Sequence, residues 1–169
     1  MSLRLILIRH AKSDWNSPHD NDHARILNAR GRRSADAIGG WLEAKGYVPE
    51  LIISSDAART AETTARLINQ FTTKPERQFS HALYHASPMT ILDIIQEAQV
   101  NNVALVGHNP GVGMVAHMLA ASEPAHPRFD DYPTCAATVV DCPVTAWSDL
   151  ENRENTIVDF VVPRDLTEG

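Results

Sequence analysis

The chain has 169 residues, of which 43% are hydrophobic and 21% are charged, and its net charge at pH 7 is −6. This length supplies one buried core but too little material for two ordinary domains, so we expect a single domain over residues 1–169. The acidic balance argues against a general nucleic-acid binder, and no stretch reaches the ~20 apolar residues of a membrane span.

The first half of the chain alternates predicted strands and helices. The aliphatic run Leu3–Arg9 predicts a buried strand. Ala29–Lys45 places apolar residues on one helical face and meets Gly46, a typical helix end. Leu51–Ser54 predicts a second buried strand, and Ala57–Phe71 predicts a second amphipathic helix.

The second half continues this alternation and then changes character. Pro88–Ala98 predicts a helix that opens with a proline, Asn102–Val106 a strand, and Gly111–Ala121 another helix. Ala136–Val140 and Thr156–Val162 are predicted strands with no helix between them. Consecutive strands of this kind indicate an antiparallel addition at a sheet edge.

These elements together predict an α/β fold with three α/β/α layers, a mostly parallel central sheet and an antiparallel edge strand. Two polar stretches, Asn16–Asp22 and Ser122–Pro133, predict loops that could border a pocket, and the second is expected to run over the surface. Cys135 and Cys142 are interpreted as reduced, packed thiols of a cytoplasmic protein, because the short apolar run at the start soon turns charged and does not suit a signal peptide.

Arginine and histidine residues follow three of the predicted parallel strands. Arg9 and His10 come after the first strand, Arg59 follows the second, and His108 follows the third. Because ligands of open parallel sheets bind beyond the carboxyl ends of the strands, we expect these side chains to meet there. A neutral imidazole can attack phosphorus, and guanidinium groups offer planar pairs of donors to phosphoryl oxygens. The sequence therefore predicts a phosphate site.

Four segments, in the same order along the chain, resemble the histidine phosphatase superfamily, which also contains the cofactor-dependent phosphoglycerate mutases. The segments are Arg9–Asn16 (RHAKSDWN), Leu27–Gly31 (LNARG), Ser54–Thr63 (SSDAARTAET) and Val106–Asn109 (VGHN). The alanine after His10 and the short length make the chain most similar to the compact SixA-like phosphohistidine phosphatases. The resemblance implies a phosphoglycerate mutase-like fold.

The resemblance also implies a role for each matching residue. His10 would take the phosphoryl group, Arg9 and Arg59 would hold its oxygens, and His108 would complete the pocket. Further substrate contacts are implied for three residues of the matching segments: Ser13, Asn16 and Asn109. Neither a metal nor another cofactor is implied, because the cationic pocket supplies the charge stabilisation that Mg²⁺ gives elsewhere.

The general acid is the point at which the resemblance breaks down. Leu83-Tyr84 is followed by His85, where related short sequences carry a glutamate. The acid candidates are then His85 and Asp14. A phosphomonoester leaves as an alkoxide and needs a proton, a contribution of ~10²–10⁴ in rate, whereas the imidazole of phosphohistidine can be protonated before it departs. This difference favours phosphohistidine in a protein as the substrate, with a small-molecule phosphomonoester as the alternative.

Other hypotheses stay open at this stage. The chain could be a non-catalytic phosphate-binding module, or a metal-dependent hydrolase with His10, Asp14 and His108 as ligands. Two further pairs, His19 with His23 and His81 with His85, have a spacing that suits a metal on a helix, but their composition favours loops.

Two sets of surface candidates have less specific interpretations. Arg30, Arg32 and Arg33 are interpreted as a solvated helix face, with guidance of an acidic partner toward the pocket as the alternative. Trp15 is expected to pack against the protein. The sequence makes no prediction of the oligomeric state.

Overall fold

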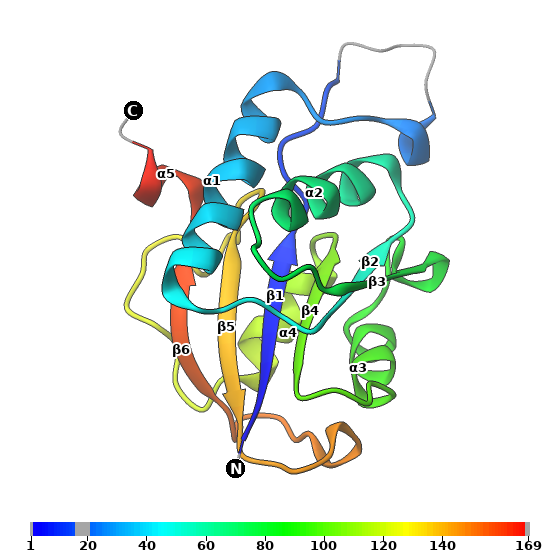
Figure 1. The fold of residues 1–169 in the computed structure, drawn as a ribbon. Helices are drawn as coiled ribbons and strands as arrows, with labels where there is room; N and C mark the ends of the chain where they lie inside the picture. The colour runs from blue at the N-terminus through cyan, green and yellow to red at the C-terminus, as the bar shows by residue number, and fades with distance from the viewer. Residues whose placement is uncertain (1, 16–20, 168–169) are drawn as a thin grey trace.

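A central sheet of six strands organises the fold (Figure 1). The computed structural model describes residues 2–15 and 21–167. In chain order the strands are β1 (Leu3–Arg9), β2 (Leu51–Ser55), β3 (Glu76–Ser80), β4 (Asn102–Gly107), β5 (Ala137–Cys142) and β6 (Thr156–Val161). Their order across the sheet is β3-β2-β4-β1-β5-β6.

The strand directions agree with the predicted mixture of parallel and antiparallel pairs. The strands β1, β4, β2 and β3 run parallel to one another. In contrast, β5 runs antiparallel to β1, and β6 runs antiparallel to β5. The last two strands are therefore an antiparallel addition at one edge, and the predicted α/β fold is confirmed.

Helices cover both faces of the sheet (Figure 1). The four longer ones are α1 (Ala29–Lys45), α2 (Ala58–Asn69), α3 (Pro88–Gln96) and α4 (Gly111–Leu119). The shorter ones are α5 (Pro163–Leu166) and the 3-10 turns η1 (Asp22–Ala24), η2 (His81–Leu83) and η3 (Trp147–Asp149). The longest helix, α1, begins where the Asn28 side chain accepts a hydrogen bond from the Gly31 amide, and it ends at Gly46, whose φ of 75° is left-handed.

The alternation of side chains along β1 divides the core into two clusters. Leu5 and Leu7 pack with residues of α3 and α4, such as Val112. Ile6 and Ile8 point to the other face and pack with residues of α1 and α2. This two-sided burial explains why the strand is a continuous aliphatic run.

Two segments differ from the sequence-based expectation. The edge strand β3 was not predicted, because four of its five residues are exposed and its sequence has no aliphatic run. The stretch Ser122–Pro133 is a loop, as predicted, but it does not simply run over the surface, because Phe129 and Tyr132 are buried. The Tyr132 hydroxyl donates to the Leu7 carbonyl, so this loop is fastened to the central strand.

Within the described residues, no helix combines the length and the apolar character that a bilayer crossing needs.

Candidate active site

The ends of three parallel strands bring the predicted histidines and arginines together. Arg9 is the last residue of β1 and is followed by His10, Arg59 lies in the first turn of α2, and His108 follows β4. The exposed fraction is 7% for His10, 3% for Arg59 and 4% for His108. The centroids of the two imidazole rings are 5.4 Å apart. Residues almost 100 positions apart thus share one buried centre, which we call the His10 centre.

His10 is held in one orientation and in one protonation state. Its Nδ1 lies 2.7 Å from the Ala11 carbonyl oxygen, which can only accept, so Nδ1 carries the hydrogen and Nε2 keeps a free lone pair. Burial lowers the pKa of His10 to about 3, with help from the positive charges of Arg59 and Arg9 and against the hydrogen bond to Ala11. A neutral imidazole with a free Nε2 is a nucleophile at ordinary pH.

The backbone around His10 is fixed on several sides. The His10 amide donates to the Gly107 carbonyl of β4 over 3.0 Å, and the His10 carbonyl accepts from the Cys135 amide over 3.0 Å. The next amide, that of Ala11, donates to the Thr63 hydroxyl of α2. His10 is therefore anchored to a strand, a loop and a helix at once.

His108 faces the same centre through a different contact. Its Nε2 lies 2.8 Å from the Ser55 hydroxyl at the end of β2, so this side chain neither caps α4 nor bonds a loop carbonyl. Burial, with the neighbouring His10 and Arg59, lowers the pKa of His108 to about 3. When the Ser55 hydroxyl donates to Nε2, the hydrogen of the neutral ring is on Nδ1.

Three buried nitrogen atoms of the His10 centre have no hydrogen-bond partner within residues 2–15 and 21–167. They are Arg9 Nε, Arg59 Nε and His108 Nδ1. Arg9 does use Nη1, which donates to the Tyr132 carbonyl over 3.1 Å. A buried donor without a partner costs about 1–3 kcal/mol. A tetrahedral oxyanion offers acceptors that would remove this cost.

A rim of polar residues surrounds Arg59. Arg59 Nη1 donates to the Asp22 carbonyl over 2.7 Å, and Nη2 donates to the Asp22 carboxylate over 3.1 Å. The same carboxylate accepts from Arg25 over 2.8 Å and from the Tyr84 hydroxyl, and it lies 3.2 Å from His85 Nε2. Burial opposes ionisation of Asp22, but the hydrogen bonds from Tyr84 and Arg25 and the charge of Arg59 outweigh it and lower the pKa. Asp22 is thus a fixed anion beside Arg59.

Sequence reasoning did not assign Asp22, Arg25 or Tyr84 to the site. Asp22 ends the polar stretch that was predicted to border a pocket, and Tyr84 directly precedes the acid candidate His85, so weak signals for both were present. For Arg25 the sequence gave no signal. In the structure its guanidinium is buried and donates to Asp22, and its Cζ lies 3.6 Å from the centroid of the Trp15 ring. Trp15 itself is 75% exposed, so the expectation that it packs against the protein interior is wrong.

The remaining predicted residues occupy different positions. Ser13 is buried and accepts from Arg25. Asn109 donates to the Tyr132 carbonyl over 2.9 Å and accepts from the Gly113 amide over 3.1 Å, so its amide group holds a loop and α4 instead of facing outward to a substrate. Asn16 lies outside the described residues.

The two acid candidates are also far from equivalent. The backbone amide of Asp14 donates a hydrogen bond to the Ile26 carbonyl. The negative charge of Asp14 adds to that of Glu62 in raising the pKa of Arg32 on α1. His85, in contrast, lies at the rim: its ring centroid is 5.5 Å from that of His108, and its Nε2 is 3.4 Å from Arg59 Nη2. The geometry places His85, and not Asp14, next to the His10 centre.

Metal-ligand groups in the described part of the chain lie outside this centre. His10, Asp14 and His108 do not form a group with ligand atoms within 4.8 Å of one another, whereas His23, Asp56 and His81 do. The Asp56 carboxylate lies 2.8 Å from His23 Nε2 and 2.9 Å from His81 Nδ1. One histidine from each predicted spaced pair thus meets a shared carboxylate, a donor set that zinc accepts.

Comparison with known proteins identifies related sequences. The family model of the histidine phosphatase superfamily (branch 1) matches residues 5–79. An uncharacterized protein of Mycobacterium leprae is 32% identical over an alignment of 166 positions, and the alignment covers 93% of this chain and 100% of that protein. An uncharacterized protein of Arabidopsis thaliana is 32% identical over an alignment of 133 positions, which covers 72% of this chain and 61% of that protein.

Solved structures with the same fold include phosphatases of several kinds. A protein of Agrobacterium tumefaciens assigned as the phosphohistidine phosphatase SixA is 28% identical, with a TM-score of 0.78 over 96% of this chain and 99% of that chain. A protein histidine phosphatase SixA complexed with tungstate has the same TM-score of 0.78 at 17% identity, over 98% and 100% of the two chains. A mycobacterial glucosyl-3-phosphoglycerate phosphatase gives a TM-score of 0.63 at 17% identity, over 94% and 98%.

Proposed function

The chain belongs to the histidine phosphatase superfamily, and we propose that it removes phosphoryl groups from phosphohistidine in proteins, through a covalent intermediate on His10. One observation carries this proposal above the others. The free Nε2 of a neutral, buried His10 shares its centre with three buried nitrogen atoms that have no partner within the described residues. A nucleophile surrounded by donors suits the transfer of a phosphoryl group.

The reaction has two steps. In the first, the His10 Nε2 lone pair forms a bond to phosphorus while the bond from phosphorus to the leaving group breaks. Arg9, Arg59 and the Nδ1 hydrogen of His108 offset the charge on the equatorial oxygens. In the second, water attacks phosphorus and gives a proton to His85, the group that has just protonated the leaving group. The phosphorus–nitrogen bond of His10 breaks, phosphate leaves, and the His10 imidazole is neutral again.

Proton transfer to the leaving group is assigned to His85. Its Nε2 lies 3.2 Å from the Asp22 carboxylate, which holds the ring at the rim of the His10 centre. Asp22 cannot act as the acid itself, because its pKa is lowered and it stays ionised. His85 is exposed at the rim of the His10 centre, a position that suits contact with a leaving group.

Phosphohistidine is the preferred substrate for a chemical reason. An imidazole leaving group can be protonated before the bond to phosphorus breaks, so it makes a smaller demand on His85 than an alkoxide does. The likeness to the A. tumefaciens protein assigned as SixA supports the same choice. We place the reaction in the cytoplasm, where Cys135 and Cys142, both free and buried, would remain reduced.

A small-molecule phosphomonoesterase is the second candidate. The observation in its favour is the same position of His85 beside Asp22 and Arg59, since an imidazole there could also give a proton to an alkoxide. The comparison of hydrolysis rates on phosphoramidate, a histidine-phosphorylated protein and p-nitrophenyl phosphate separates the two candidates.

Trapping the intermediate tests the proposed chemistry directly. Mixing the enzyme with ³²P-phosphoramidate and quenching within milliseconds should give one labelled protein species whose label is lost in acid and retained in base. His10→Ala should abolish both the label and the turnover, whereas His117→Ala, a change outside the His10 centre, should preserve both. Wild-type hydrolysis by the His10→Ala protein would exclude this mechanism.

A further inference from the structure

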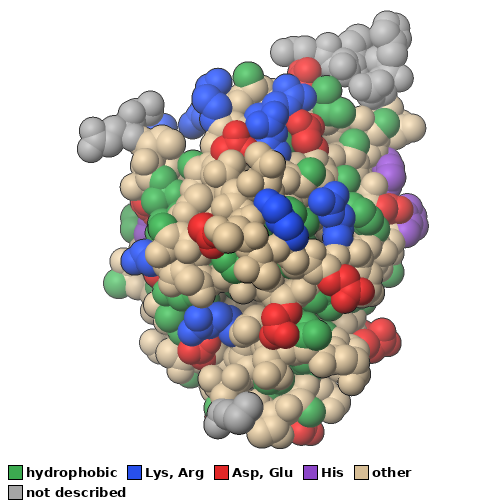
Figure 2. All heavy atoms as spheres, in the orientation of Figure 1, with side chains coloured by type: hydrophobic (Ala, Val, Ile, Leu, Met, Phe, Trp, Pro, Cys, Tyr) green, Lys and Arg blue, Asp and Glu red, His purple; other side chains and the backbone are tan. Residues whose placement is uncertain are grey.

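Two adjoining surface hollows lie beside the start of α1. Their volumes are about 270 Å³ and about 430 Å³, and both are lined by Arg30, Ser34, Pro163 and Arg164. We call the pair the basic groove. Its remaining cations are Lys12 and Arg128 in the first hollow and Arg33 in the second. Figure 2 shows Lys and Arg side chains gathered at the end of the molecule where α1 begins.

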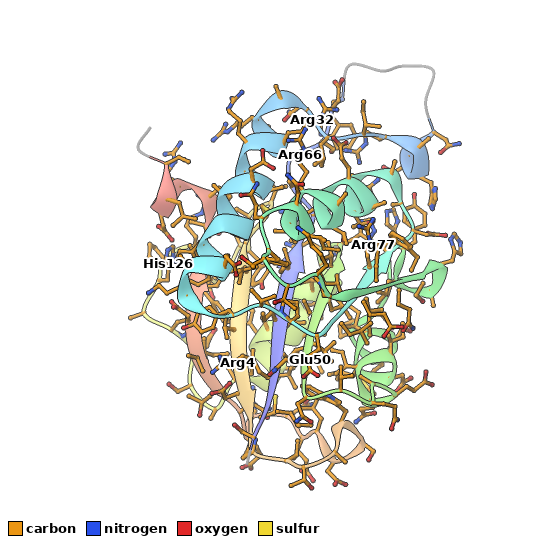
Figure 3. The ribbon with its side chains drawn as sticks, viewed as in Figure 1. Arg4, Arg32, Glu50, Arg66, Arg77 and His126 are labelled. Carbon is orange, nitrogen blue, oxygen red and sulfur yellow. The ribbon has the colours of Figure 1, made fainter. Side chains whose placement is uncertain are left out.

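Most cations of the basic groove are not neutralised by the protein. Arg128 is paired with Asp131, but four exposed cations have no ion pair within residues 2–15 and 21–167: Lys12, Arg30, Arg33 and Arg164. On the neighbouring helix surfaces Arg32 is paired with Glu62, and Arg66 is paired with Asp36. Figure 3 labels the two arginines. The chain has 21 acidic and 15 basic residues, so a site with four unpaired cations does not follow from composition.

The fold disfavours a cation at one of these positions. Arg30 lies in the first turn of α1, where a cation is disfavoured by the helix dipole. An anion bound beside these exposed cations would offset their charge and would account for their presence in the groove.

The basic groove is continuous with the wall of the His10 centre. Lys12 lies two residues after His10 on the same segment. Pro133 and Thr134 line the groove, and their neighbours on each side contact the catalytic segment: the Tyr132 carbonyl accepts from Arg9, and the Cys135 amide donates to the His10 carbonyl. A ligand in the groove therefore lies against the segment that carries the nucleophile.

We propose that the basic groove binds an acidic segment of the phosphoprotein substrate while its phosphohistidine reaches His10. This inference rests on the proposed function and adds the kind of protein that the enzyme prefers. A small phosphate needs the His10 centre alone. Carboxylates that flank a phosphohistidine are attracted in addition by the four cations of the groove that lack an ion pair. Charge complementarity of this kind raises the association rate and makes it fall with salt.

Charge reversal within the groove provides the test. Arg30→Glu and Arg164→Glu, singly and together, are compared with Arg77→Glu, the same change of charge on β3 at the sheet edge away from β6 (Figure 3). Three donors are used: free phosphoramidate, an acidic protein and a basic protein, the two proteins phosphorylated on histidine. The measured quantity is kcat/KM at low and at high salt.

The expected result is selective. Together, the two groove variants should lower kcat/KM on the acidic phosphoprotein by about tenfold or more at low salt, with a smaller loss at high salt. Phosphoramidate hydrolysis should stay within about twofold of the wild type, and Arg77→Glu should behave as the wild type on every donor.

Other outcomes overturn the inference. An unchanged rate on the acidic phosphoprotein, an equal loss on phosphoramidate, or a wild-type preference for the basic phosphoprotein would each exclude an acidic protein as the occupant. If the wild-type enzyme hydrolysed none of the three donors, the proposed function itself would fail, which is a result distinct from failure of the groove.

Discussion

The two histidines of the His10 centre are kept neutral by burial, and this ties their chemistry to the stability of the fold. In the unfolded chain an imidazole takes up a proton near pH 6.5. In the folded protein the pKa of His10 and that of His108 lie at about 3. Between these values the unfolded state binds more protons, so the free energy of unfolding falls as the pH falls.

This linkage predicts acid sensitivity that His10 substitution reduces. For each histidine this effect is absent above about pH 6.5 and grows as the pH falls toward 3. At pH 5 each histidine should have lowered the free energy of unfolding by about 1–2 kcal/mol relative to neutral pH. Urea unfolding of the wild type at pH 5 and pH 7 should therefore give a larger difference in free energy than unfolding of His10→Asn. Equal differences for the two proteins would contradict the burial argument, and the two histidines predict little change between pH 7 and pH 8.

Arg59 uses different nitrogen atoms for two separate roles. Its Nη atoms bind Asp22, and its Nε is one of the buried nitrogens without a partner within the described residues. We expect Arg59→Ala to lower kcat by about 10²-fold or more on phosphoramidate, by analogy with the loss of one charge-stabilising donor. Arg59→Lys should recover little of this loss, because an ammonium group cannot supply the planar pair of donors.

The control for Arg59 is another arginine of the same helix. Arg66 also lies on α2 and forms an ion pair, with Asp36, but it points away from the His10 centre toward α1. Arg66→Ala should therefore leave kcat within about twofold of the wild type, since exposed pairs contribute little to stability. Equal losses for the two alanine variants would mean that Arg59 acts through the helix and not at the phosphate.

At the scale of elements, the start of α1 packs directly on the segment that follows His10. A Cβ at Gly31 would lie 2.0 Å from the Lys12 carbonyl oxygen, which also accepts a hydrogen bond from the Asn28 amide. Gly40 lies in the same helix, and a Cβ there would meet nothing within 4 Å. The two glycines form a matched pair within one helix.

Alanine at these two positions should have opposite effects. Gly31→Ala should lower the free energy of unfolding by about 1–3 kcal/mol, because α1 must move away from the segment after His10, and it should lower kcat as well. Gly40→Ala should raise the free energy of unfolding by up to about 1 kcal/mol with unchanged kcat, because alanine is the better helix former. Urea unfolding and phosphoramidate turnover measure both quantities. Similar effects at the two positions would show that the close approach of Gly31 is unimportant.

The elements also show how far the sequence alone determines the fold. The strands β1, β2 and β4 were predictable because both of their faces are buried, so each is an aliphatic run. The strand β3 was not, because an exposed edge strand requires no such pattern. Parallel topology brings the residues after these strands to one edge, which is why the predicted histidines and arginines lie together.

The rim of the site could not be derived in the same way. Asp22, Arg25 and Tyr84 lie in η1, its flank and the segment after η2, where no hydrophobic period fixes the position of a side chain. The contacts among them depend on how two loops meet above α2, which is tertiary information. Tyr132 likewise lies in a stretch that the sequence marks as a loop, yet it is buried against β1. Local patterns therefore predicted that His10, Arg59 and His108 lie together, but not which residues form the rim around them.

At the scale of the whole molecule, an anion in the His10 centre would connect separate parts of the fold. Arg9 belongs to β1, Arg59 to α2 and His108 to the end of β4, and the two core clusters lie on opposite faces of these strands. Because β1 contributes to both clusters, the protein should unfold in one cooperative transition. A ligand that binds this centre in the folded state alone then stabilises the whole domain.

Vanadate, which mimics pentacoordinate phosphorus, should accordingly raise the melting temperature. At a concentration 100 times its Kd the stabilisation is about 2.7 kcal/mol, which corresponds to about 5–10 °C for a domain of this size. The shift should disappear in Arg59→Ala and persist in Arg77→Ala, because Arg59 belongs to the His10 centre and Arg77 lies on the exposed edge strand β3. Scanning calorimetry distinguishes the outcomes: two separate transitions would contradict the single domain, and an undiminished shift in Arg59→Ala would place the anion elsewhere.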